Sequence, residues 1–241
     1  MNTYYSKAEI DEISEGLIEV YKQQYPDKVV SYVDIEHFIT SFLGLAIEYT
    51  SFAEDDKGKI GFTSDGTTKL MISSNGRIIP FVYPKNTIVI DKVLLSKNEY
   101  GRCRFTMAHE AAHNILSELQ KENAKAYFHN EFDNEKAYSV DELKQMFNSI
   151  EWQADAMAAS LLMPRTLVQI AMDKFIGANN IKVYGTNTFA SKDRKAIKDM
   201  AAYLGVSFSA LKIRLEYLNM IEKEDMTEFI HKEILQGGWL Q

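Results

Sequence analysis

The segment His109-Glu110-Ala111-Ala112-His113 places two imidazoles and a carboxylate inside a stretch with helical periodicity. In a helix, His109 and His113 lie one turn apart on one face, where both can bind a single zinc ion. Glu110 then lies beside the metal without having to bind it, as a general base for zinc-bound water requires. The apolar residues that define the buried face of this helix are Phe105, Ala108, Ala112, Ile115, Leu116 and Leu119.

A second periodic segment, residues 139–164, offers a third ligand. A capping box of Ser139 and Glu142 is expected at its start. Glu151 and Asp155 lie one helical turn apart at the border of its apolar stripe. Carboxylates that face a core are costly unless a cation neutralises them, and a metal with a metal-bound histidine would do so. We therefore predict Glu151 as the third metal ligand and Asp155 as the acceptor of the free ring N–H of one histidine.

Simpler interpretations of these segments remain open. The histidines could belong to an ordinary core helix, and the two carboxylates could be a solvated helix edge. The extended metzincin pattern requires Gly and His where the chain has Leu116 and Leu119, so that class is excluded. His129 is another candidate ligand, but it lies in a polar stretch that is more typical of an exposed histidine.

The chain resembles the ImmA/IrrE zinc metallopeptidases, whose second motif reads roughly E-x-x-A-[ND]-x-F-A-x-x-L-L-M-P. Residues 104–113 match the zinc helix of that family, and residues 151–164 match the second motif in the expected order. Residues 87–91 resemble the strand before the zinc helix, and residues 204–215 resemble the C-terminal helical signature. The similarity covers about residues 30–220.

Three departures from the family pattern are visible. The chain has Ala112 where Gly is common, and Met157 where Phe is common. The stretch of about residues 119–139 between the two helices is a longer insertion than a minimal member needs, and it could form a lid, a recognition element or a surface loop. None of these changes removes a predicted metal ligand.

The resemblance implies a zinc-dependent, site-specific endopeptidase with Zn²⁺ as its cofactor and Glu110 as its catalytic base. Such enzymes cleave or inactivate a regulatory protein of the repressor type, often encoded on a mobile element, with effects on gene regulation. The alternative is a regulatory module that does not cleave and binds DNA or a transcription factor, with structural or vestigial zinc. An inhibitory partner that binds without cutting is a third possibility.

Charge patterning bears on the DNA-binding alternative. The net charge of −7 argues against a general attraction to nucleic acid or acidic membranes. Residues 192–214 are locally basic, with six basic and two acidic side chains. The spacing around Gly205 is that of a helix-turn-helix over about residues 194–218. One interpretation is that the segment contacts DNA directly through Lys212 and Arg214. The favoured interpretation is that it forms two packed helices of the peptidase domain.

Cysteine content and hydropathy indicate a cytoplasmic protein. The single Cys103 excludes an internal disulfide framework and suits a reducing compartment. A lone cysteine close to the zinc helix suggests a catalytic role, but a small buried hydrophobe is the more usual case. The chain has no apolar run long enough to span a membrane, and its first residues lead into an amphipathic helix rather than a signal segment.

The predicted fold class is α+β, with a zincin-like metallopeptidase core. We expect one domain over residues 1–241, since no linker or repeat divides the chain. A capping box of Ser6 and Glu9 begins a first helix whose buried stripe includes Val20, and Asp34 caps a second helix. The expected parts are N-terminal helices (1–44), a small twisted sheet (45–91), zinc-binding helices (102–164) and a helical C-terminal portion (165–241). The expected strands are residues 45–52, 59–63, 69–73, 77–83 and 87–91, with a hairpin turn at 74–76.

Overall fold

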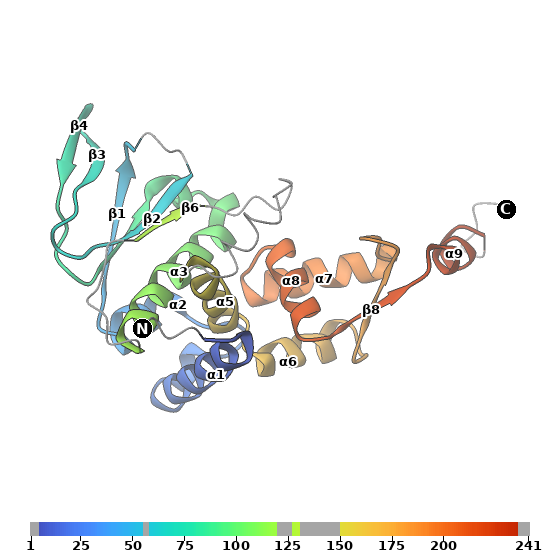
Figure 1. Ribbon diagram of the computed structural model, residues 1–241. Helices are drawn as coiled ribbons and strands as arrows, with labels where there is room; N and C mark the ends of the chain where they lie inside the picture. The colour runs from blue at the N-terminus through green and yellow to red at the C-terminus, as the bar shows by residue number, and fades with distance from the viewer. Residues whose placement is uncertain (1–4, 55–57, 120–126, 131–149, 236–241) are drawn as a thin grey trace. The chain divides into compact units, whose positions relative to one another are not determined.

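The computed structural model describes residues 5–54, 58–119, 127–130 and 150–235, and it has an α+β fold (Figure 1). Its contacts group into two compact units, Met1–Leu162 and Met163–Gln241. The prediction of a single domain stays a prediction. Most of the expected insertion and the expected capping box of Ser139 and Glu142 lie outside the described residues.

Two N-terminal helical segments begin at side-chain caps, as predicted. Helix α1 (Lys7–Gln24) begins with a reciprocal capping box, in which the Ser6 side chain accepts from the Glu9 N–H and the Glu9 carboxylate accepts from the Ser6 N–H. After a short 3₁₀ turn, η1 (Pro26–Lys28), the Asp34 carboxylate caps α2 (Ile35–His37). A π-helical turn, η2 (Phe38–Phe42), continues α2 toward the sheet.

The buried face of α1 differs from the predicted stripe. It is formed by Ile10, Asp11, Ser14, Ile18 and Tyr21, whereas Val20 is 46% exposed. The predicted stripe counted only apolar residues, but this face also buries two polar ones. Asp11 accepts a hydrogen bond from the Ser160 hydroxyl of α5 (Ile150–Leu162) at 2.9 Å, so the buried carboxylate has a partner there.

The five strands expected before the zinc helix are confirmed, and a sixth strand extends the sheet. They are β1 (Ala46–Phe52), β2 (Lys59–Thr63), β3 (Leu70–Ser74), β4 (Arg77–Phe81), β5 (Thr87–Asp91) and β6 (Tyr127–Asn130). Within the described ranges the strand order is β4-β3-β1-β5-β2-β6, with β1 and β5 parallel and the other pairs antiparallel. Asn75 and Gly76 join β3 to β4 with positive φ angles of 50° and 74°, as a two-residue hairpin turn requires.

The two faces of β2 have different partners because side chains alternate along a strand. Phe62 packs into an apolar cluster with Leu70, Ile72, Tyr83 and Val89. Gly61 and Thr63 lie on the opposite face, where α3 (Tyr100–Leu119) packs against β2 and β5. Two 3₁₀ turns, η3 (Lys92–Leu95) and η4 (Lys97–Glu99), lead from β5 into α3. The sheet therefore supports one side of the helix that carries both histidines.

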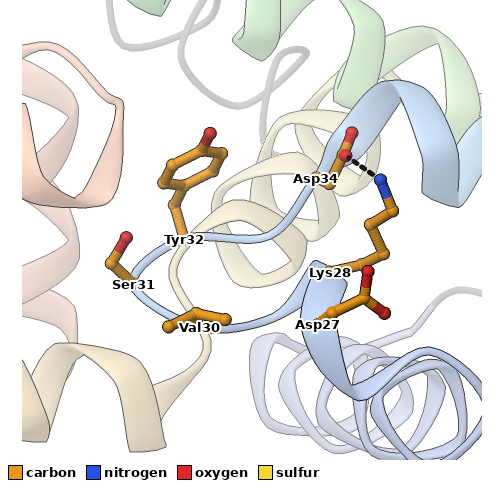
Figure 2. Close-up of a pocket in the computed structure, with 6 residues that line it drawn as sticks. All are labelled: Asp27, Lys28, Val30, Ser31, Tyr32 and Asp34. Atoms are coloured by element: carbon orange, nitrogen blue, oxygen red, sulfur yellow. Dashed lines mark hydrogen bonds and ion pairs between the residues drawn. The ribbon is translucent and has the colours of Figure 1, made fainter.

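A loop after η1 is attached to α3 through Arg104. The buried Arg104 donates a hydrogen bond to the Val33 carbonyl at 2.9 Å, and its guanidinium lies 4.7 Å from the centre of the Tyr32 ring. This loop borders a small pocket, drawn in Figure 2, in which Lys28 pairs with Asp34 at 3.2 Å. The pocket lining is Asp27, Lys28, Val30, Ser31, Tyr32 and Asp34, so it shares no residue with the predicted metal site.

The second unit is mainly helical and contains a small parallel ribbon that the periodicity did not predict. Its elements are α6 (Arg165–Phe175), β7 (Ile181–Tyr184), α7 (Ser191–Leu204), α8 (Phe208–Tyr217), β8 (Ile221–Glu224), α9 (Met226–Phe229) and the π-helical turn η5 (Ile230–Leu235). Strands β7 and β8 pair in parallel over four residues each. Gly205 ends α7 with φ of 67°, and Ser207 caps α8.

No helix in the described ranges is both long enough and apolar enough to cross a bilayer.

The Ser6 cap allows a stability test. Ser6→Ala leaves the Glu9 N–H without its side-chain acceptor, so the free energy of unfolding should fall by about 1 kcal/mol in urea denaturation. Ser96→Ala is the matched control, because the Ser96 side chain makes no capping hydrogen bond to η4. An equal loss in both variants would contradict a specific role for the cap.

Candidate metal centre

Helix α3 brings the two histidines together in the interior of the first unit. His109 and His113 are 1% and 0% exposed, and their rings meet edge to face with centroids 4.6 Å apart. The Nε2 atoms of the two rings lie 3.0 Å from each other. One-turn spacing on a helix therefore produces the convergence that the sequence predicted.

Helix α5 supplies a carboxylate to the same point. Glu151 Oε2 lies 3.2 Å from His109 Nε2, and Glu151 Oε1 lies 3.4 Å from His113 Nε2. One ligand atom from each of these three residues lies within 4.8 Å of the other two, so the group could hold a metal ion. The packing of α3 against α5 creates this arrangement, because Glu151 is distant from both histidines in the sequence.

The donor set fits a zinc ion. Two imidazole nitrogens and a carboxylate are typical ligands, and zinc–nitrogen distances of about 2.0–2.1 Å in a tetrahedral site separate two ligand nitrogens by roughly 3.3 Å. The 3.0 Å separation of the two Nε2 atoms is close to this value. Small side-chain adjustments would therefore suffice to accommodate the ion.

Asp155 lies one turn after Glu151 and contacts the far side of the His109 ring. Its Oδ1 atom is 2.8 Å from His109 Nδ1. Burial lowers the pKa of His109, but the hydrogen bonds with Asp155 and Glu151 outweigh burial and raise this pKa to about 10, so a metal would have to displace the Nε2 proton. Once that proton is lost, the Asp155 carboxylate favours the tautomer in which Nδ1 keeps its hydrogen and the Nε2 lone pair is free for the metal.

Glu110 follows His109 on α3 and is completely buried. Its Oε2 accepts a hydrogen bond from the Thr63 hydroxyl of β2 at 2.6 Å, while its Oε1 has no hydrogen-bond partner among the described residues. Burial raises the pKa of Glu110 to about 7, with a smaller upward contribution from the charge of Glu151. His109 and the Thr63 hydrogen bond act in the opposite direction. This carboxylate is therefore poised to exchange a proton near neutral pH.

The pKa values of His113 and Glu151, the other two members of the group, are both lowered, but for different reasons. Burial lowers the pKa of His113, which favours the neutral imidazole that a metal requires. Burial alone would raise the pKa of Glu151, but hydrogen bonds with His109 and His113 hold it well below its usual value. Each of these residues therefore favours the protonation state in which it can bind a cation.

Helix α1 and the residue Tyr5 that precedes it contact α5. The Tyr5 N–H donates to the Gln153 side chain at 2.9 Å, and Ser160 donates to the buried Asp11. Gln153 lies between Glu151 and Asp155 and Ser160 lies further along the same helix, so both contacts restrain the helix that carries the two carboxylates.

Two residues of β2 near Glu110 were not predicted from the sequence. Thr63 touches the Glu110 carboxylate, and a Cβ atom at Gly61 would lie only 2.6 Å from Glu110 Oε1. The Gly inside a strand was a usable signal, since such a glycine often marks a close approach by another group. No pattern in the sequence distinguished Thr63 from other strand threonines.

The other candidate residues each belong to an element of their own unit. The backbone of His129 belongs to β6, and Cys103 is buried near the start of α3. Arg214 is only 2% exposed and donates through Nε to the Met163 carbonyl at 2.9 Å. Lys212 forms an ion pair with Glu216 at 3.5 Å. The suggested contact of Arg214 with DNA stays a prediction, and the burial of this side chain argues against it.

Comparison with known families identifies a match over the segment that contains α3 and α5. The model of the peptidase M78 family, described as the IrrE N-terminal-like domain, matches residues 43–216. The chain belongs to this family. Membership in this family supports a metallopeptidase-type function. The matched residues include both helices that carry the metal group. A search of curated proteins found no match to the chain.

The burial of Cys103 predicts low thiol reactivity. Burial and the nearby Glu36 charge raise the pKa of Cys103 to about 11, against a smaller opposing contribution from Arg104. At pH 8 the thiolate, which is the nucleophile, should be scarce. In a test with Ellman's reagent, the native protein should react slowly, and one thiol per chain should be released in denaturant. Rapid reaction of the native protein would contradict the buried position.

Proposed function

We propose that the protein is a zinc-dependent, site-specific endopeptidase that acts on a regulatory protein in the cytoplasm. The observation that carries this proposal is the convergence of His109, His113 and Glu151 beside the buried carboxylate of Glu110. A purely structural metal site does not require an additional carboxylate of this kind.

In this proposal His109, His113 and Glu151 are the zinc ligands. When bound, the ion supplies a Lewis acid for the scissile carbonyl and lowers the pKa of water at the site. Only these three residues form the candidate group in the described part of the chain. This number agrees with a catalytic centre, since structural sites usually close all four positions with protein ligands.

Glu110 is the proposed general base and acid. It accepts a proton from the attacking water and then returns that proton to the leaving amine of the peptide. Its Oε1 atom is buried without a hydrogen-bond partner among the described residues, so this oxygen has a lone pair available for the proton. Asp155 is the proposed positioning residue for His109, through its contact with Nδ1.

The substrate assignment rests on the family resemblance. A repressor-type protein is the proposed target, because the ImmA/IrrE enzymes that the chain resembles act on such regulators. A preference for one partner would make the protein a poor general protease.

The alternative of a DNA-binding module is weakened at the two contacts suggested for it, while Lys192, Arg194, Lys195 and Lys198 of α7 are exposed. Of the two basic side chains suggested as DNA contacts, Arg214 is buried and Lys212 is paired with Glu216. A direct reader of DNA needs exposed cations that can reach phosphates. The peptidase is therefore the better account of the chain.

Metal stoichiometry tests the ligand assignment. After zinc reconstitution and desalting, the parent should retain one zinc per chain, Glu151→Ala should retain it more weakly, and a His109→Ala/His113→Ala double variant should lose it. Glu118→Ala is the control, because Glu118 is an exposed carboxylate at the end of the same helix as the histidines. Zinc retention by the double variant would contradict the assignment.

Substitution of Glu110 tests the proposed chemistry. Glu110→Gln keeps the size of the side chain but removes its proton-accepting carboxylate, so cleavage should fall by about 10²–10⁴-fold while zinc binding is retained. Cleavage should be followed by the release of new amino termini. Glu118→Gln should cleave like the parent, and equal cleavage by Glu110→Gln and the parent would overturn the mechanism.

A further inference from the structure

Strand β2 approaches the Glu110 carboxylate with two residues of one face. The Thr63 Oγ1 atom lies 2.6 Å from Glu110 Oε2 and 3.3 Å from the Glu110 carbonyl oxygen. The hydroxyl has one hydrogen to donate, and the shorter distance assigns it to the carboxylate. Thr63 therefore ties the end of the Glu110 side chain to the sheet.

Gly61 leaves the space that the other carboxylate oxygen occupies. A Cβ atom at this position would lie 2.6 Å from Glu110 Oε1 and 2.6 Å from Thr106 Cγ2. Both distances are far shorter than an ordinary van der Waals contact. A glycine at this point of β2 is thus required for the observed orientation of Glu110.

We propose that Thr63 is a positioning residue for the peptidase reaction, and that it acts with Gly61 to direct Glu110 Oε1 toward the water that attacks the substrate. This inference rests on the proposed function. It assigns to β2 a part in the reaction that is separate from metal binding, since neither residue belongs to the group that could hold the metal.

The chemistry explains why one hydrogen bond is sufficient. Donation by Thr63 uses one lone pair of Oε2, whereas Oε1 has no hydrogen-bond partner among the described residues, so Oε1 is the more basic oxygen and receives the proton taken from water. The hydroxyl can keep donating to Oε2 after Oε1 is protonated, and neither side chain has to rotate before the proton passes to the leaving amine. The carboxylate would therefore keep one geometry through both proton transfers.

The hydroxyl can be removed without breaking the sheet. The backbone of Thr63 pairs with Ile88 of β5 and Tyr127 of β6, and these contacts do not involve the side chain. Thr63→Val preserves the β-branched shape and removes the hydroxyl, whereas Thr63→Ser preserves the hydroxyl. Thr87→Val is the matched control, because Thr87 is a buried threonine at the start of the adjacent strand β5.

The first readout is steady-state cleavage of the best substrate from a pool of internally quenched peptides of randomised sequence. Thr63→Val should lower kcat about 10–100-fold, because a misplaced general base loses part of the rate enhancement that it normally supplies. KM and zinc stoichiometry should be unchanged. Thr63→Ser should recover most of the parental kcat, and Thr87→Val should retain it. Gly61→Ala should also lower kcat, because the added methyl displaces the carboxylate.

The second readout uses zinc-free protein and requires no activity. Thr63→Val should shift the urea midpoint of unfolding more in the parent protein than in a Glu110→Ala variant. In the Glu110→Ala variant the hydrogen bond between the two side chains is already absent, so removing the hydroxyl costs less. Thr87→Val should shift the midpoint equally in both backgrounds. This cycle isolates the contact between Thr63 and Glu110 from any general effect on folding.

The outcomes separate the two proposals. Parental kcat in Thr63→Val, or no difference between the two backgrounds, overturns the positioning role while the peptidase assignment stands. A fall in kcat that Thr63→Ser does not restore also overturns it, since shape rather than the hydroxyl would then matter. If Glu110→Gln cleaves a substrate as fast as the zinc-loaded parent does, the proposed function fails, and the positioning role fails with it.

Discussion

The burial of His109, Glu110 and His113 in one helix is the constraint on which the first unit depends. Ionisable groups removed from water are costly unless hydrogen bonds or opposite charges compensate. Here the compensation comes from separate parts of the chain: Glu151 and Asp155 of α5 face the histidines, and Thr63 of β2 holds the carboxylate. The site therefore exists only when the sheet and both helices pack together.

This constraint explains the arrangement of the surrounding elements. One face of β2 packs into an apolar cluster, while the other face presents a glycine and a threonine to α3. Helix α1 packs on α5 and buries Asp11 for a hydrogen bond with Ser160. The polar positions in these elements are thus as specific as the apolar ones, and they fix the relative positions of the groups that could hold a metal.

Local sequence signals predicted most of the secondary structure of the first unit. Side-chain caps marked the starts of α1 and α2, and the change to a period of two marked five strands. Errors arose where a residue's environment depends on distant segments. Val20 was assigned to the buried face of α1, because apolar periodicity could not reveal that Asp11 and Ser14 are buried there instead. The parallel pair β7 and β8 was missed because its strands are four residues long and far apart in the chain.

The sequence by itself determined the family of the chain and the convergence of two histidines, because residues four apart on a helix share a face whatever surrounds them. The same argument placed Glu151 and Asp155 together on a second helix. Only the tertiary structure decided how that helix meets α3, that Arg214 is buried, and that Thr63 and Gly61 of a strand enclose the Glu110 carboxylate. These last contacts depend on the packing of a sheet against a helix, and no local period in a sequence encodes the register between two such elements.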